Sequence, residues 1–121
     1  MAAPNLVNVS SIYGKTVGAA IGTSDADWVT CPAEKVLKIN TIIVANIDGS
    51  NAVDVSIKWY DASASATIQL AATVSVPADS TLVVMGKDSP IYLEEGDRIR
   101  GLASAASDAE VTISYEELDD A

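Results

Sequence analysis

Apolar and polar residues alternate with a period of two in several segments of this sequence. The alternation is clear in residues 53–60, 67–76 and 111–116. Successive side chains of a strand point to opposite faces, whereas a helix needs an apolar period near 3.6. Each segment is therefore predicted to be a strand with one face against a core. The apolar members are Val53, Val55, Ile57 and Trp59; then Ile68, Leu70, Ala72, Val74 and Val76; then Val111, Ile113 and Tyr115.

Residues 36–47 are apolar on more than one side. One predicted face holds Leu37, Ile39, Ile43, Ala45 and Ile47, and the other gains Ile42 and Val44. Central strands that are covered on both faces have this kind of composition. We expect a central strand that is covered on both faces over part of its length, or one that faces a neighbouring subunit.

Clusters of turn-forming residues separate these segments. They lie at residues 48–51, 61–65, 77–79, 87–90 and 104–108, and a spacing of about 8 to 14 residues is typical of sandwiches and jelly rolls. No window has the apolar stripe of a long amphipathic helix. The predicted fold is all-β, a single antiparallel β-sandwich or jelly roll.

Two parts lie outside the regular pattern. Residues 1–12 are predicted to be an N-terminal arm, and residues 13–121 a single β-sandwich domain that ends in a short acidic tail at 116–120. An arm can lie across its own sheet or pair with an edge strand of a neighbour. The predicted assembly contacts are Leu6, Val7, Val9, Ile12 and Tyr13.

The charge of the chain excludes some partners. Asp and Glu number 17 against 7 Lys and Arg, which gives a net charge of -10 over 121 residues. Such a surface repels phosphate, so no nucleic-acid partner is expected. No apolar segment reaches the ~20 residues that cross a bilayer, and no signal-like segment opens the chain, so no membrane partner is expected. We expect a soluble protein of one domain.

The sequence offers few candidate catalytic or metal-binding residues. The sequence has no histidine, the residue most used as a general base and as a transition-metal ligand. The single cysteine, Cys31, cannot form an internal disulfide and is predicted to be a small buried hydrophobe. We therefore predict no catalytic, cofactor-binding or metal-binding residues, and no enzyme.

Residues 90–101, PIYLEEGDRIRG, concentrate three carboxylates and two guanidinium groups. Glu94 and Glu95 are adjacent, so on a strand they point to opposite faces and cannot share a substrate. Gly96 suits a turn that requires a positive φ. The stretch is predicted to be a charged corner, with Arg98 and Arg100 pointing outward and pairing with nearby acids.

Other candidates also favour structural roles. Residues 48–54, DGSNAVD, partly match a calcium loop, but the flanking helices, the glycine at the sixth position and the glutamate at the twelfth position of an EF-hand are missing. A glycine-containing β-turn explains them better. Trp59 is predicted to lie in the core, whereas Trp28 could lie in the core or form part of an exposed aromatic platform.

Residues 76–102, VPADSTLVVMGKDSPIYLEEGDRIRGL, resemble a segment of small virion proteins of tailed bacteriophages, particularly marine ones. Residues 46–50 and 53–55 are similar to an upstream part of the same family, so the resemblance extends from about Lys35 to Tyr115. It implies a structural part of the phage particle, often a decoration or cement protein on the outer capsid, or a component of the neck or tail. It implies no catalytic residue.

The resemblance leads to a first hypothesis and three alternatives. The first is a non-enzymatic capsid decoration protein on the outer surface of the head, without cofactors. It would form a homo-oligomer, with a trimer expected, and bind the major capsid protein or another virion protein. The alternatives are a neck or tail component, a carbohydrate or host-surface binding module that uses exposed tryptophans, and an enzyme. The lack of proton-transfer groups makes the enzyme the weakest of these.

Overall fold

The computed structural model describes residues 6–7 and 9–119, which form β-strands and no helix. The strands are β1 (Ser11–Ala20), β2 (Ala26–Thr30), β3 (Lys35–Asn46), β4 (Val53–Asp61), β5 (Ala66–Val76), β6 (Thr81–Met85), β7 (Ile91–Leu93), β8 (Arg98–Ala103) and β9 (Ala109–Asp119). The predicted all-β fold is confirmed. Nothing in this described part is a helix that is long and apolar enough to span a membrane.

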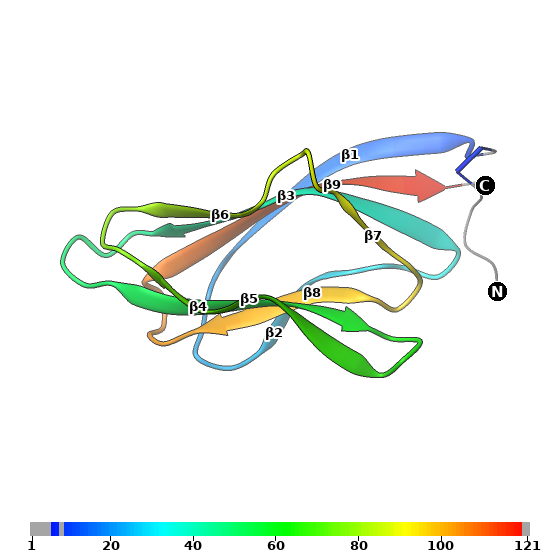
Figure 1. Ribbon diagram of the computed structural model, residues 1–121. Coiled ribbons are helices and arrows are strands. Elements are labelled where there is room, and N and C mark those ends of the chain that lie inside the picture. The colour runs from blue at the N-terminus through cyan, green and yellow to red at the C-terminus, as the bar shows by residue number, and fades with distance from the viewer. Residues whose placement is uncertain (1–5, 8, 120–121) are drawn as a thin grey trace.

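The strands form two antiparallel sheets that face each other (Figure 1). Sheet A has the order β1-β9-β3-β6, and β7 also pairs with β3. Sheet B has the order β2-β8-β4-β5. The sheets cover each other with their apolar faces, as in other β-sandwiches.

The strand order defines the sandwich as a jelly roll. Four nested pairs run from the ends of the chain toward its middle: β1 with β9, β2 with β8, β3 with β6 and β7, and β4 with β5. The chain is thus a long antiparallel ribbon that is rolled up, so that β9 also joins β3 and β8 also joins β4. This is the jelly-roll arrangement, with β7 as a short additional strand.

The core lies between the sheets and consists mainly of valine, isoleucine and leucine. In β4, the side chains of Val53, Val55 and Ile57 are buried and Trp59 packs against them, as the alternation predicts. Val111 and Ile113 of β9 are buried on the facing sheet. Branched side chains of this kind pack well on a pleated surface.

The inward face of β3 differs from the prediction. Leu37 and Ile39 are buried in the core, but farther along the strand Ile42 and Val44 are buried, while Ile47 is exposed. The register between β3 and β9 shifts between Ile39 and Thr41. The extra residue, Asn40, forms a β-bulge that turns the rest of the strand over. Ile43 and Ala45 therefore lie on the outer face of sheet A.

The alternation predicted for residues 67–76 is also interrupted. The register between β5 and β4 shifts twice, around Ile57, and Thr73 has a φ of 50°. Val76 is buried and Val74 is half-buried, but Ile68 and Ala72 are exposed. Because β5 borders sheet B and pairs only with β4, these irregularities leave the rest of the sandwich in register.

The two ends of the domain also differ from the expected boundaries. The acidic residues 116–119 belong to β9 and lie between β1 and β3, so they are not a tail. Lys35 forms an ion pair with Asp119, and Lys15 Nζ lies 3.1 Å from Glu117 Oε1. Ser11 and Ile12, expected in the arm, begin β1. Of the expected arm and tail, residues 1–5, 8 and 120 lie outside the described residues.

Candidate interaction surfaces

The charged corner at residues 90–101 is a structural turn. Gly96 has a φ of 87°, as a turn with a glycine requires, and the Asp97 N–H donates to Glu94 O at 2.9 Å. Glu94 and Glu95 are exposed. The Gly96 N–H donates to Cys31 O at 3.0 Å, which ties the turn to the end of β2. The predicted corner is confirmed.

Asp97 has a structural role that the sequence did not reveal. Its side chain is only 2% exposed, and its two carboxylate oxygens accept separate backbone hydrogen bonds. The Ala62 N–H donates to Oδ1 at 2.9 Å, and the Glu94 N–H donates to Oδ2 at 3.0 Å. Asp97 therefore joins the β7–β8 turn to the β4–β5 loop. Both oxygens of this buried carboxylate have hydrogen-bond partners, as buried polar groups require.

Arg98 and Arg100 lie on the outer face of sheet B, as predicted. Both reach the same acid: Arg98 Nη1 lies 3.1 Å from Asp27 Oδ2, and Arg100 Nε lies 2.9 Å from Asp27 Oδ1. The two guanidinium groups also lie over the ring of Tyr60, at 5.1 and 5.7 Å from its centroid. Each cation is attracted to the face of the aromatic ring.

Lys58 extends this basic face, which we define as Lys58, Arg98 and Arg100. Its Nζ lies 2.8 Å from Asp25 Oδ1. The register places Lys58 opposite Arg100 and Tyr60 opposite Arg98, so all four side chains share one side of sheet B. The two aspartates compensate most of this positive charge. The basic face is thus a surface whose cations are held in ion pairs, and not a free cationic site.

The two tryptophans pack against the core and do not form an exposed platform. Trp59 is half-buried there, as predicted, and so is Trp28, whose position the sequence left open. The ring of Trp28 covers Gly101 so closely that an added Cβ at Gly101 would lie 2.7 Å from the ring and 2.2 Å from Ser56 O. The large exposed aromatic side chains are Tyr13 and Tyr92 instead.

Cys31 is buried, as predicted, and its chemistry is suppressed. Burial raises the pKa of the thiol to about 11, and the nearby carboxylate of Asp97 adds to the increase. The Sγ atom lies 3.2 Å from Lys35 O, to which the thiol donates. Because the thiolate is the nucleophile, a thiol with such a pKa is unreactive near neutral pH.

Residues 48–51 form a turn that is closed by an aspartate. Asp48 Oδ1 accepts hydrogen bonds from the backbone N–H groups of Ser50 at 2.8 Å and Asn51 at 3.3 Å. These bonds lower the pKa of the Asp48 carboxyl. The predicted turn is confirmed as an Asx-type turn. Among residues 6–7 and 9–119, no group of three or more His, Cys, Asp or Glu side chains could hold a metal ion.

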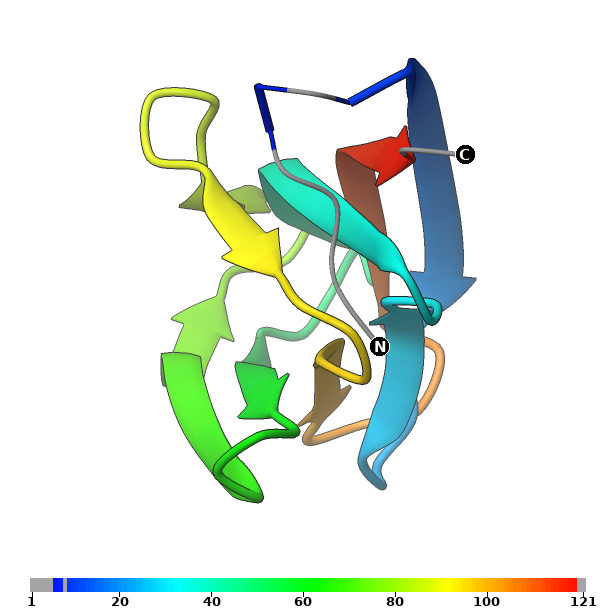
Figure 2. The same cartoon turned by 90° about the vertical axis from the view of Figure 1, so that its right-hand side faces the viewer.

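The predicted assembly residues lie at one end of sheet A, where the chain enters β1 (Figure 2). Ile12 and Tyr13 are 60% and 52% exposed on β1. Leu6 and Val7 are also exposed, and Val9 is half-buried. Most of these apolar side chains are therefore exposed, and their role in assembly stays a prediction.

The outer face of sheet A is partly apolar, which the sequence pattern did not predict. Behind the Asn40 bulge, Ile43 and Ala45 are half-buried on this face, and Val83 of β6, opposite Ile43, is exposed. At the other end of the sheet, Val36 and Leu118 are paired neighbours on this same face and are almost completely buried. This outer face is a second apolar surface beside the exposed residues at the start of β1.

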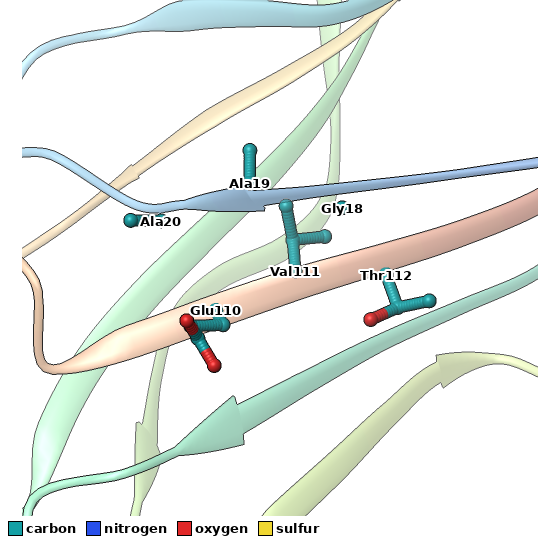
Figure 3. Close-up of a pocket in the computed structure, with 6 residues that line it drawn as sticks. All are labelled: Gly18, Ala19, Ala20, Glu110, Val111 and Thr112. Atoms are coloured by element: carbon teal, nitrogen blue, oxygen red, sulfur yellow. The ribbon is translucent and has the colours of Figure 1, made fainter.

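A depression of about 310 Å³ lies along β1 and β9 (Figure 3). Its lining consists of Gly18, Ala19, Ala20, Glu110, Val111 and Thr112. Because the residues on β1 are so small, the backbone of that strand is open to contact from outside. Its polar side chains are those of Glu110 and Thr112, both on β9, and no polar side chain of β1 faces them across the depression.

Comparison with solved structures shows a related fold in phage particles. A chain of the acidic stable capsid structure of Helicobacter pylori bacteriophage KHP30 matches with a TM-score of 0.55 and 7% identity, over 93% of this chain and 91% of that chain. At this identity the likeness shows the fold alone. The sequence matches no protein-family model and no curated protein.

A pentameric capsid protein isolated from metagenomic phage sequences matches more weakly. One crystal structure of such a protein gives a TM-score of 0.39 at 16% identity, over 97% of this chain and 68% of that chain. A second gives 0.40 at 17% identity, over 98% and 66%. TM-scores this low do not establish a common fold. The jelly-roll class therefore rests on the strand order and on the first comparison.

Proposed function

We propose that this protein is a non-enzymatic structural component of a phage particle, and specifically a decoration protein bound to the outer surface of the head. The observation that carries the proposal is the jelly-roll fold, which matches a phage capsid chain over nearly the whole of both chains. Jelly rolls also occur in lectins and enzymes, so the fold needs support from the surfaces.

The side chains and surfaces support a role in adhesion. The groups that resembled a reactive site are tied into the fold: Asp97 bonds two backbone amides, and Asp27 holds Arg98 and Arg100. Most of the large exposed apolar side chains lie instead at the start of β1 and on the outer face of sheet A. Exposed apolar groups of this kind mark protein contacts. The partner is the major capsid protein or another virion protein.

Labelled particles separate the head from the neck or tail. Antibody or gold label against this protein, viewed by electron microscopy on intact particles, should decorate the head over its whole surface. A label confined to the neck or tail would reject the decoration role and support the alternative position. Particles without label would reject a surface role altogether.

The arm can be tested on the same particles. Removing residues 1–9 leaves β1 intact, since β1 begins at Ser11, and should reduce co-sedimentation with capsids by more than about 10-fold. A finer variant, Leu6→Asp/Val7→Asp, should have a similar effect. The matched control, Ala64→Asp/Ala72→Asp, adds the same charge at two exposed positions, one in the β4–β5 loop and one in β5, and should bind normally. Unchanged binding of the truncated protein would remove the arm from the proposal.

The protein is also proposed to be a homo-oligomer. The trimer expected from the resemblance remains a prediction about the number of chains, and a mass measurement in solution decides it. When one subunit of an oligomer binds a repeating lattice, it raises the effective concentration of the other subunits at the neighbouring sites. The oligomer can therefore bind tightly although each single contact is weak.

A further inference from the structure

The borders of the two sheets differ in how well they are protected. In sheet B, β5 has two register shifts and a left-handed Thr73, and β2 has five residues with a shift between Asp27 and Val29. In sheet A, the border opposite β1 is divided between β6 and β7, of five and three residues. Short strands, bulges and interruptions are the usual means by which proteins prevent pairing at a sheet border.

The border formed by β1 has none of these protections. All ten residues, Ser11–Ala20, pair with β9 in an unbroken register, and the strand contains no proline. Its one charged residue, Lys15, forms an ion pair with Glu117 of its own sheet. Figure 2 shows β1, in blue, at the right-hand border of sheet A with no described strand beyond it. A long and regular border of this kind is a template for another strand.

The hydrogen bonds show which backbone groups are free to pair. The Ile21 N–H donates to Ala109 O at 2.9 Å, so the odd-numbered residues of this register direct their backbone N–H and C=O groups toward β9. Hydrogen bonding alternates along an antiparallel pair, so the even-numbered residues of β1 direct their N–H and C=O groups outward. Three of these residues, Gly14, Gly18 and Ala20, have little or no side chain, which leaves the backbone accessible.

We propose that β1 pairs antiparallel with β1 of a second copy of this chain, across a two-fold axis. Two copies that meet border to border have one combination in which neither strand is protected, and that combination is β1 with β1. A two-fold contact also requires a surface that is complementary to itself. The proposal concerns the protein alone and holds independently of its place in a particle.

A register centred on Thr16 gives every even-numbered residue of β1 an even-numbered partner. With Thr16 opposite Thr16 of the second copy, Gly14 lies opposite Gly18 and Ile12 opposite Ala20, and all of these are even-numbered residues. In the same register Lys15 faces Val17, so the two lysines avoid each other. A register with Lys15 opposite Lys15 would place like charges side by side, which is destabilising.

The contact joins the two copies of sheet A into one continuous sheet. Ile43, Ala45 and Val83 of both copies then lie on one side of it, which doubles the apolar surface on that face. A two-fold contact produces an even number of chains: two if it acts alone, and six if a separate contact joins three chains.

Solution mass tests the pairing directly. The chain has a mass of 12.5 kDa, and sedimentation equilibrium should show an even-numbered oligomer. The variant Gly14→Lys/Gly18→Lys places lysines opposite each other across the axis, and the fold has room for them: nothing lies within 4 Å of a Cβ at Gly14, and at Gly18 the nearest atom is Val111 O at 3.6 Å. It should weaken association by at least about 100-fold, because opposed like charges cost several kcal/mol.

A matched control adds the same charge elsewhere. Gly22→Lys/Gly86→Lys also uses two glycines with nothing within 4 Å of an added Cβ, and neither lies in β1. This control should associate like the unchanged protein. A second disrupting variant, Thr16→Pro, removes an outward N–H and should also give monomers. Far-ultraviolet circular dichroism should show that all three variants remain folded.

The result that would overturn the proposal is equally specific. A monomeric unchanged protein, or a Gly14→Lys/Gly18→Lys variant that associates as tightly as the control, contradicts pairing through β1. The register has its own test in a Cys31→Ser background. Thr16→Cys should form a covalent dimer on oxidation, because paired positions lie within disulfide range, whereas the exposed loop variant Ser63→Cys should not. Failure of Thr16→Cys to cross-link contradicts the Thr16 register.

Discussion

Asp97 is the residue whose substitution should affect stability most clearly. Asp97→Ala leaves the N–H groups of Ala62 and Glu94 without their acceptor. We expect a loss of about 2 to 4 kcal/mol in the free energy of unfolding, measured by urea denaturation, since hydrogen bonds to a charged group contribute about 1.5 to 3 kcal/mol each. Glu94→Ala, at an exposed carboxylate of the same turn, should change it by less than about 0.5 kcal/mol. Equal effects would contradict the role of Asp97.

Cys31 makes stability depend on pH in the alkaline range. Burial raises the pKa of its thiol from 9.0 to about 11 in the folded protein. Below the ordinary value both states keep the proton. Above it the unfolded chain loses its proton first. The stabilisation that the protonated thiol gives the folded state is therefore lost as the pH rises from 9 toward 11.

The thiol can be tested against a variant without it. Between pH 8 and pH 11, the range that contains the thiol pKa values of 9.0 and about 11, the unchanged protein should lose more stability than Cys31→Ala, which lacks the thiol. Ellman's reagent should also react with the unfolded chain and barely with the folded one. Rapid labelling of the folded protein at pH 8 would show that the thiol is accessible.

At the level of elements, proline substitutions in β1 report the direction of each backbone group. Val17 is odd-numbered, and its N–H points toward β9, so Val17→Pro breaks the pairing of these strands. It should lower the free energy of unfolding by about 2 to 4 kcal/mol. Thr16→Pro removes a group that points away from β9 and should cost clearly less, because border strands tolerate proline there. Thermal unfolding of the two variants measures the difference, and the reverse order would refute the assigned directions.

The elements also show what the sequence could predict. The regular alternation of β4 and β9 was sufficient to place Val55, Ile57 and Val111 in the core. The bulge at Asn40 was not predictable, since nothing near this residue in the sequence shows that β9 has one residue fewer on its side. β1 was missed because its apolar pattern is weak, and its strand conformation depends on pairing with β9 at the other end of the chain.

On the surfaces too, local features were predictable from the sequence and contacts between distant residues were not. Arg98 and Arg100 were predicted to face outward and to pair with acids, because both follow a turn glycine on an alternating strand. Their partner, Asp27, lies 71 residues from Arg98 and could not be identified from the sequence. The outer apolar face of sheet A was missed, because it exists only through the bulge in β3. Local pattern thus predicts which way a side chain points, and the fold decides what it meets.

At the scale of the whole molecule, the protein is a rolled β-ribbon in which Asp97, Arg98 and Arg100 are bonded to other parts of the fold, and most of its large exposed apolar residues lie in two places. The start of β1 and the outer face of sheet A belong to the same sheet. Pairing of β1 across a two-fold axis would extend this sheet, and the arm would supply further contacts at its end. Such a surface would suit the proposed binding to a repeating lattice.

The most direct test of the proposed structural role on the head is the saturation of capsids with purified protein. Heads that lack this protein are mixed with increasing amounts of it, sedimented, and analysed for bound protein. A structural component of the head should bind until a fixed number of copies per particle is reached, in a constant ratio to the major capsid protein. Protein that stays in the supernatant, or binding that never saturates, would contradict a structural role on the head.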